Sequence, residues 1–105
     1  MSYFLKEKQF LLFLLSTQQK QALVILANLT LPQILSLREI CYNLVNNTFP
    51  LSDKEIKVLT PYKKIIKSIS NSSITQKKKT IKTNKGKVYK ILKTIDHRIY
   101  DMMSD

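Results

Sequence analysis

The clearest structural signal in the chain lies in residues 30–59, which read TLPQILSLREICYNLVNNTFPLSDKEIKVL. Thr30 and Gln33 are three positions apart, and so are Ser52 and Glu55. This spacing is typical of a capping box, in which two side-chain oxygens accept hydrogen bonds from backbone N–H groups that a helix leaves free at its N-terminus. The stretch therefore predicts two helices, one beginning just after Thr30 and one just after Ser52.

The first of these two helices is predicted to be amphipathic and to run to about Asn47. Pro32 falls in its first turn, where the missing backbone N–H costs no hydrogen bond. Arg38 and Glu39 are expected to face away from the apolar side. Residues 46–50 are rich in turn formers and predict the end of the helix. The apolar positions recur three and four residues apart, at Leu31, Ile34, Leu37, Cys41, Leu44 and Val45.

Two further helices are predicted towards the N-terminus. Ser2 is placed to cap the first, over residues 3–15. Ser16 and Gln19 form another candidate capping box, for a helix over residues 17–29. The second half of the first helix is apolar on every side, so it needs burial on more than one side. It is either the central helix of a compact bundle, or it is covered by a second copy of the chain or a larger partner.

The C-terminal half is also predicted to be helical, with interruptions. Pro61 interrupts the fourth predicted helix, which is expected to kink there or to restart with Thr60 as its cap. Ser73 and Gln76 repeat the capping pair ahead of a short helix that is expected to end near Lys82. These local signals predict at least two helices between Pro61 and the turn expected at residues 83–86.

A second turn is expected at residues 83–86, where Gly86 is able to adopt a left-handed backbone conformation. A final amphipathic helix should follow, because apolar residues recur at helical spacing at Val88, Ile91, Leu92, Ile95, Ile99 and Met102. The single glycine and three prolines argue against the many tight turns of a β-sandwich or barrel. We therefore expect an all-α fold. It should be one domain over residues 1–105, a small bundle of four to six helices with an apolar half (1–50) and a basic half (51–105).

Several classes of site are not predicted. Cys41 is the only cysteine and is expected in the core, and together with His97 it does not supply the ligands of a zinc site. The longest apolar runs, at residues 10–15 and 22–27, fall far short of the ~20 residues that a membrane helix needs. Neither a glycine-rich phosphate loop nor a pair of catalytic carboxylates is recognisable. We expect no enzymatic activity, no cofactor, no metal and no membrane span.

The charge of the chain is distributed unevenly. The net charge is +11, yet residues 1–53 hold four basic residues against three acidic ones. Residues 54–98 hold fourteen basic residues against two acidic ones, Glu55 and Asp96. Mutual repulsion among so many lysines opposes compaction unless a polyanion is nearby. The commonest such polyanion is nucleic acid.

The lysines of the basic half are therefore the candidate nucleic-acid-binding residues. The set is Lys63, Lys64, Lys67, Lys77, Lys78, Lys79, Lys82, Lys85, Lys87, Lys90 and Lys93. Arginine, the usual reader of guanine edges, occurs only as Arg38 and Arg98. Its scarcity favours binding of double-stranded DNA without sequence readout, by neutralisation of phosphates. Such a protein is expected inside cells, in the nucleus, or in a virion.

The central part of the sequence resembles a known family. Residues 37–70 read LREICYNLVNNTFPLSDKEIKVLTPYKKIIKSIS, and the basic stretch that follows ends in KGKVYKIL at residues 85–92. The pattern resembles small basic proteins of Polinton/Maverick-type elements and adintoviruses. The matching residues are Glu39, Ile40, Asn43, Leu44, Pro50, Leu51, Ser52, Leu59, Tyr62, Lys63, Lys64, Lys77, Lys78, Lys79 and Gly86.

This resemblance covers roughly half the chain. It implies a virion-associated core protein, comparable in role to the DNA-condensing peptides of adenoviruses. Members of that family mix arginine with lysine and carry a double glycine before an apolar tail. This chain has one glycine, and residues 93–105 form a charged tail.

Other roles for the same features are open. The lysines also suit a solvated helix face, or a basic amphipathic helix that meets anionic lipid. The apolar stripes also suit a protein-interaction or oligomerisation module, with a capsid protein or a host protein as partner. Tyr62, Tyr89 and Tyr100 are placed to stack on bases, although partial burial at the edge of the core is the commoner role of such residues.

Overall fold

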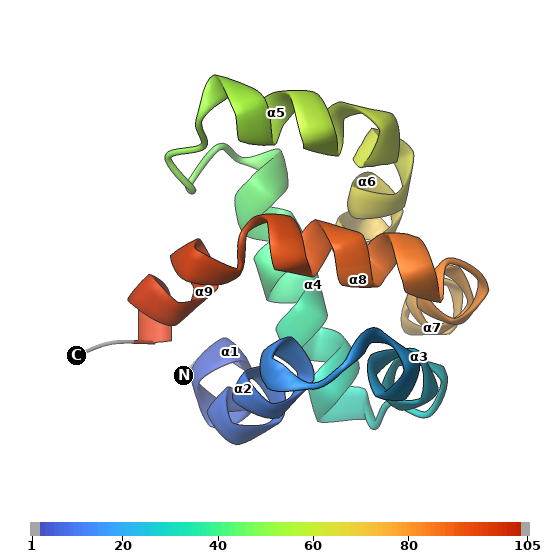
Figure 1. Ribbon diagram of the computed structural model, residues 1–105. Helices are drawn as coiled ribbons and strands as arrows, with labels where there is room; N and C mark the ends of the chain where they lie inside the picture. The colour runs from blue at the N-terminus through green and yellow to red at the C-terminus, as the bar shows by residue number, and fades with distance from the viewer. Residues whose placement is uncertain (1–2, 104–105) are drawn as a thin grey trace.

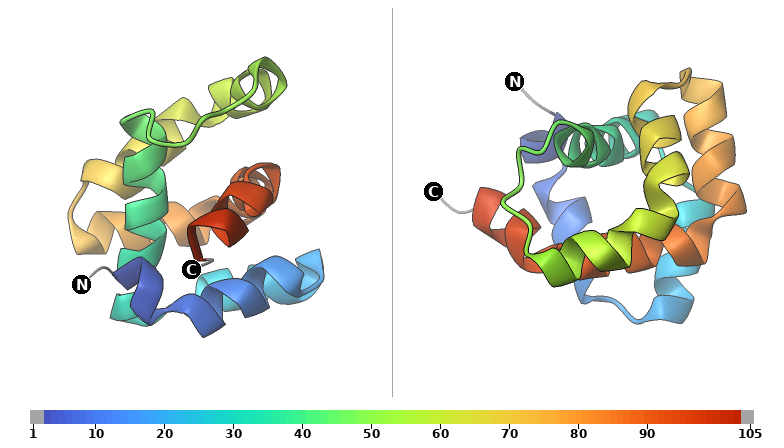
Figure 2. Two further views of the ribbon diagram at one scale, coloured as in Figure 1. Left: turned by 90° about the vertical axis from the view of Figure 1, so that its left-hand side faces the viewer. Right: turned by 90° about the horizontal axis from the view of Figure 1, so that it is seen from above.

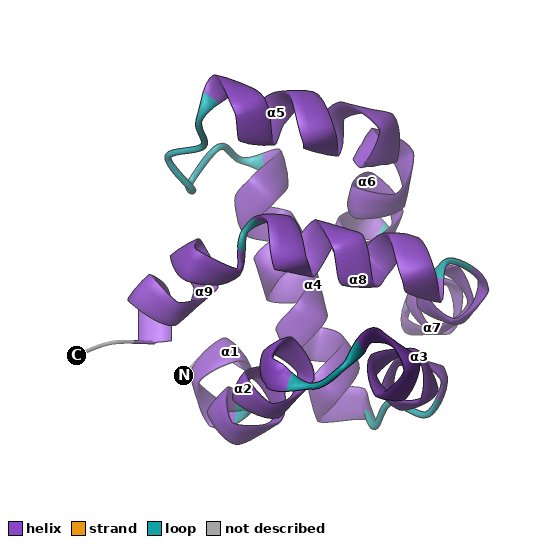
Figure 3. Ribbon diagram, viewed as in Figure 1, coloured by secondary structure: helices purple, strands orange, loops and turns teal. Residues whose placement is uncertain are grey.

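The computed structural model describes residues 3–103, and every regular element in that range is helical (Figures 1 and 3). The elements are α1 (Tyr3–Lys6), α2 (Lys8–Ser16), α3 (Gln19–Ala27), α4 (Leu31–Val45), α5 (Asp53–Leu59), η1 (Thr60–Tyr62), α6 (Lys63–Asn71), α7 (Ile74–Thr83), α8 (Lys85–Thr94) and α9 (Asp96–Met103). The predicted all-α class is confirmed. The described residues form nine α-helices and one 3₁₀ helix, more than the four to six predicted, because several predicted helices are broken in two.

The longest helix, α4, extends from the level of the N-terminal helices towards α5 (Figure 1) and lies towards one side of the molecule in Figure 2 (right). It is covered by α1, α6 and α7. On the side of α4 shown in Figure 2 (left), α5, the α8–α9 segment and α2 lie in three tiers. Helices α8 and α9 occupy the middle tier, because α8 contacts both α3 and α5 while α9 contacts α2. The C-terminal helices therefore close the bundle against the N-terminal ones.

The core is centred on α4. Ile34, Leu37, Ile40 and Leu44 are buried there, and so is Cys41. Burial raises the pKa of the Cys41 thiol to about 12, so the sulfur stays protonated and serves as a small apolar group, as predicted. The basic half supplies the facing side of the same cluster, with Ile66, Ile69, Ile81, Val88, Ile91, Leu92, Ile95, Ile99 and Met103. One core thus joins the two halves of the chain.

Three of the predicted helix starts are confirmed. At α4, Gln33 Oε1 accepts the Thr30 N–H at 2.9 Å, and the Thr30 hydroxyl accepts the Gln33 N–H in return. At α5, Glu55 Oε1 accepts the Ser52 N–H at 2.8 Å, again with the reciprocal bond. At α7 the Ser73 hydroxyl accepts the backbone N–H three residues later, at 3.2 Å. These capping residues satisfy donors that the helices cannot satisfy internally.

Other boundaries differ from the prediction. Ser16 does not cap a helix, because it ends α2 and donates its hydroxyl to a carbonyl one turn earlier. Helix α3 begins at Gln19 after two residues of extended backbone, without a side-chain cap. Gly86 lies inside α8 with no positive φ, and only Asn84 separates α7 from α8. The predicted cap Ser2 lies outside the described residues.

Two predicted helices are divided at residues that are neither glycine nor proline. Glu7 separates α1 from α2, and Ile95 separates α8 from α9. At Pro61 the chain forms the 3₁₀ turn η1, a tighter helical turn that admits proline near its start. Thr60 does not cap the following helix, because its hydroxyl donates to the Ile56 carbonyl at 2.7 Å. The chain therefore bends at Pro61 while remaining helical.

The strongly apolar helix α2 is largely covered by its own chain. Leu11, Leu14 and Leu15 are buried, whereas Phe13 is 59% exposed. One compact bundle therefore covers the leucine side of this helix and leaves Phe13 exposed. Helix α2 contacts α3 and α9 and lies at the edge of that bundle, so it is not the central helix that one alternative predicted (Figures 1 and 2).

Replacement of a true cap and of the wrongly predicted cap should have different effects on stability. Ser52→Ala removes an acceptor from the α5 N-terminus and should lower the free energy of unfolding by ~1 kcal/mol. Ser16→Ala removes only a hydroxyl that donates back into its own helix, so its effect should be smaller. Urea unfolding followed by circular dichroism measures both, and equal losses would contradict the assignment of Ser52 as the cap.

Candidate nucleic-acid interface

Three neighbouring helices carry most of the candidate lysines. Helices α6 and α7 lie side by side in Figures 1 and 2, and the Ser68 and Thr80 hydroxyls join them at 3.0 Å. Helix α8 follows α7 directly, and the Lys90 ammonium lies 6.0 Å from the centre of the Tyr62 ring in η1. Helix α8 therefore starts next to α7, and its middle lies close to η1, just before α6 begins.

Eight of the eleven candidate lysines project into solvent from these three helices. We call them the basic surface, which comprises Lys63, Lys64, Lys67, Lys78, Lys79, Lys82, Lys87 and Lys90. Of the remaining three, Lys85 is half-buried, Lys93 is exposed but paired, and Lys77 is buried. The structure thus divides the predicted set into eight available ammonium groups and three with less freedom.

Lys77 must be removed from the predicted binding set. Only 3% of its surface is exposed, and its ammonium group donates to the backbone carbonyls of Ser70 and Ser72. These carbonyls lie at the C-terminal end of α6, where a helix leaves acceptors unsatisfied and where its dipole favours a cation. Desolvation, followed by the nearby Arg38, lowers the pKa of Lys77. This lysine is a capping group and not a phosphate ligand.

The sequence contained a signal for this exception. Lys77 lies three residues after Ile74 and four residues before Ile81, so helical spacing places it on the apolar side of α7. The exposed lysines of α7, which are Lys78, Lys79 and Lys82, do not lie on that apolar side. The run Lys77–Lys79 predicts a single patch of three charges, but only Lys78 and Lys79 are exposed.

Lys93 is partly engaged within the molecule. Its ammonium group donates to the Leu15 carbonyl at 3.0 Å and lies 3.2 Å from the Asp96 carboxylate. An exposed pair of this kind is worth little energy, but it reduces the free charge. Tyr89 is partly buried against the core, the commoner role expected of it, and donates its hydroxyl to the Thr17 carbonyl at 3.3 Å. Tyr62 is also half-buried against the core.

The basic surface is not balanced by neighbouring acids in the sequence. No aspartate or glutamate occurs between Ile56 and Ile95, the stretch that holds α6, α7 and α8. The nearest acids at its two ends, Glu55 and Asp96, both engage basic side chains of α8 and α9. The ammonium groups of the basic surface are therefore left to solvent and to whatever anion approaches.

Glu55 of α5 joins this helix to α9 through contacts with two basic side chains, His97 and Arg98. Its Oε1 atom accepts the Ser52 N–H and lies 3.3 Å from Arg98 Nη2, while Oε2 lies 3.1 Å from His97 Nε2. The Ser52 N–H, together with Arg98, holds the pKa of Glu55 below its ordinary range. The His97 side chain in this contact is half-exposed.

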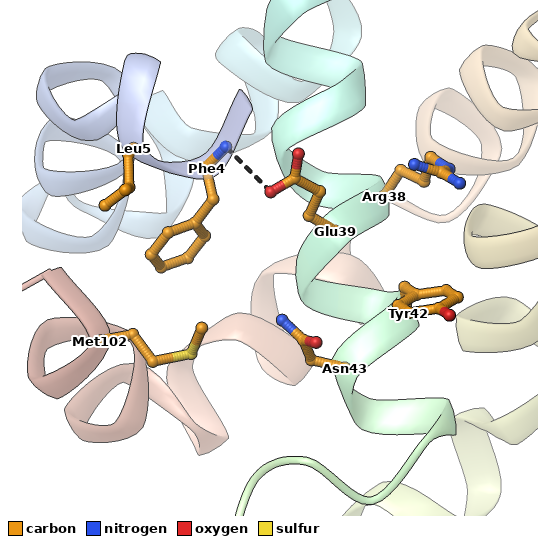
Figure 4. A pocket seen from close by; sticks show the side chains of 7 residues that line it. All are labelled: Phe4, Leu5, Arg38, Glu39, Tyr42, Asn43 and Met102. Atoms are coloured by element: carbon orange, nitrogen blue, oxygen red, sulfur yellow. Dashed lines mark hydrogen bonds between the residues drawn. The ribbon is translucent and has the colours of Figure 1, made fainter. Parts of the chain in front are cut away.

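A cavity of about 460 Å³ lies between α1, α4 and α9 (Figure 4). Phe4 and Met102 form apolar walls, and Asn43 and Glu39 supply the polar edge. The two Glu39 oxygens accept the backbone N–H groups of Tyr3 and Phe4 at 2.7 and 3.1 Å. This carboxylate therefore serves to cap α1.

Within residues 3–103 no group of three or more His, Cys, Asp or Glu side chains is placed to hold a metal ion. No single helix in that range is long and apolar enough to cross a membrane. Helices α3 and α4 reach that length and hydropathy only as a pair, bent by 113°.

The buried lysine should affect stability and not nucleic-acid binding. Lys77→Met keeps the aliphatic stem but leaves the Ser70 and Ser72 carbonyls without their donor, which should lower the free energy of unfolding by about 1–3 kcal/mol. Lys78→Met, one residue later at an exposed site, should leave stability almost unchanged. Urea unfolding of both variants measures the difference. A Lys77 variant as stable as the Lys78 variant would contradict the capping role.

The contacts of the Glu55 carboxylate predict that the stability of the fold depends on pH. The pKa of Glu55 is lower in the folded than in the unfolded chain, so its contribution is present above the unfolded value of about 4.3. That contribution is lost as the pH falls through the folded pKa. Glu55→Gln should therefore lower the free energy of unfolding at neutral pH, and the deficit should shrink in acid. Urea unfolding over this pH range measures it, and a deficit that does not change with pH would contradict the assignment.

No family model matches the sequence, and no curated protein or solved structure matches the chain. The basic surface and the cavities of the described residues are therefore the basis on which a function is assigned.

Proposed function

We propose that this protein binds double-stranded DNA without reading its sequence, through the basic surface. The observation that carries the proposal is the presence of eight exposed lysines on α6, α7 and α8, with no acidic residue between Ile56 and Ile95. Each ammonium group that meets a phosphate releases condensed counterions into solution, and this release drives binding. Such contacts need positive charge at loose spacing, which these three helices supply.

The two arginines support binding without sequence readout. Arg38 lies with its guanidinium 5.9 Å from the centre of the Tyr42 ring, and Arg98 is committed to Glu55. Both are only half-exposed. Direct readout of guanine typically uses a free arginine fork in the major groove. Lysine ammonium groups act as point charges on phosphates and carry no such preference.

The size of the molecule limits the contact that one copy can make. Its principal extents are 32 × 31 × 28 Å. One turn of duplex DNA is about 34 Å long, so a single copy covers no more than about one turn. Tight binding to long DNA would then come from several copies along the duplex. This arrangement fits a condensing role, in a virion or in the nucleus, which is the role that the family resemblance implies.

The salt dependence of DNA binding tests the proposal. The triple variant Lys78→Gln, Lys79→Gln, Lys82→Gln removes three charges from the exposed side of α7. If all three contact phosphates, the slope of log K against log salt should fall by about 0.9 per contact, and affinity at low salt should fall by tenfold or more. Fluorescence anisotropy with a labelled random duplex, measured over a series of salt concentrations, gives both quantities.

A matched control separates local contact from loss of net charge. The variant Lys6→Gln, Lys8→Gln, Lys20→Gln removes the same number of positive charges, three, from exposed positions of α1, α2 and α3. It should bind DNA with nearly the wild-type slope. The proposal fails if the wild type does not bind duplex DNA at low salt, or if the control loses as much affinity and slope as the α7 variant.

A further inference from the structure

A second cavity is distinct from the one in Figure 4 and is lined by the last residues of α4, Leu44 and Val45, where the first is lined by residues 38–43. It measures about 520 Å³ and is enclosed by the C-terminal end of α4, the following loop, α5, η1 and α6. Figure 2 (right) shows the course of these segments from above. We call this cavity the apolar bowl. Leu44, Leu59 and Ile66 form its floor, and Ile56 is 50% exposed on its α5 side.

The rim of the apolar bowl is positively charged. Lys63 and Lys67, both exposed, line its α6 side. They are four residues apart on one helix, so they lie about 5–6 Å from each other on the same face. No aspartate or glutamate lines the apolar bowl. The cavity therefore combines an apolar floor with one basic edge.

We propose that the apolar bowl docks an acidic amphipathic segment of another protein. Apolar side chains on one face of a helical segment would fill the bowl and cover Ile56. Aspartate or glutamate residues beside them would meet Lys63 and Lys67. This is the helix-in-groove mode of recognition, in which apolar anchors give affinity and flanking charges give orientation.

The chemistry of the apolar bowl favours a protein segment over DNA. Phosphates and sugars are strongly solvated, and DNA would leave the floor uncovered or lose hydration without compensation. Leucine or phenylalanine side chains gain energy when they leave water, by roughly 25 cal/mol for each Å² buried. A volume of this size lies in the range of about 300–1,000 Å³ in which proteins enclose ligand groups.

This docking site goes beyond DNA binding and can be tested separately from it. The probe is a short fluorescein-labelled helical peptide with leucine at every third or fourth position and glutamate between them. Ile56→Glu places a carboxylate on the rim and should weaken binding of this peptide about tenfold or more, equivalent to ~1.4 kcal/mol. Fluorescence anisotropy measures the affinity, and shifts of backbone amide signals in NMR spectra should map to α5 and the start of α6.

Controls separate specific docking from general attraction to lysines. Val24→Glu makes the same change at a 63% exposed site on α3 and should leave peptide affinity within about twofold of wild type. Ile56→Ser, which changes no charge, should weaken the peptide yet leave DNA affinity unaltered. The proposal is overturned if the peptide binds no better than its scrambled sequence, if the shifts map elsewhere, or if Ile56→Glu and Val24→Glu behave alike.

Discussion

The structure depends on the burial of one helix, α4. Its side chains at Leu37 and Ile40 are almost fully buried, and its neighbours α1, α6 and α7 come from both halves of the chain. A domain of this size buries only about 60–70% of the surface of its unfolded chain, so it needs one well-covered element. The Thr30 capping box fixes where α4 begins, and Asn47, with a φ of 56°, turns the chain after α4 ends. Asparagine is one of the few residues that adopt such a conformation at low cost.

The few carboxylates stabilise the N-terminal and C-terminal helices, and this leaves the lysines uncompensated. Glu39 caps α1, Glu55 joins α5 to α9, and Asp96 pairs with Lys93 at the end of α8. None of these pairs involves the exposed side of α6 or α7. Among the described residues, these carboxylates form no ion pair with the eight lysines of the basic surface, whose charge adds to the net charge of +11. Opposite charges meet where helices must be joined, and the remaining positive charges face solvent.

Local signals in the sequence predicted what local interactions determine. The caps at Thr30, Ser52 and Ser73 were predictable, because each bond spans three residues. The breaks at Glu7 and Ile95 were not, because neither a glycine nor a proline marks them. The Ser16 box failed for a related reason, since the chain adopts an extended conformation after that residue and α3 starts later.

The same distinction applies to the candidate sites. Lysine content predicted the basic surface but not the burial of Lys77, whose partners are the Ser70 and Ser72 carbonyls at the C-terminal end of α6. The apolar bowl was invisible in the sequence. Its floor combines Leu44 with Leu59 and Ile66, and these residues meet only because the chain turns after α4 and again at η1. Residues from separate elements line this cavity, so no repeating pattern in the sequence predicts it.

Helix α6 connects the two proposed sites. Lys63 and Lys67 belong to the basic surface and also to the rim of the apolar bowl. An acidic segment in the apolar bowl would therefore neutralise two of the eight lysines that DNA would otherwise contact. The other six, on α6, α7 and α8, would remain available, so partner binding and DNA binding would oppose each other without excluding each other. By reciprocity, DNA bound to the basic surface would weaken the partner by the same factor. The coupling would be electrostatic, and salt would reduce it, because exposed charges are screened over about 10 Å at moderate ionic strength.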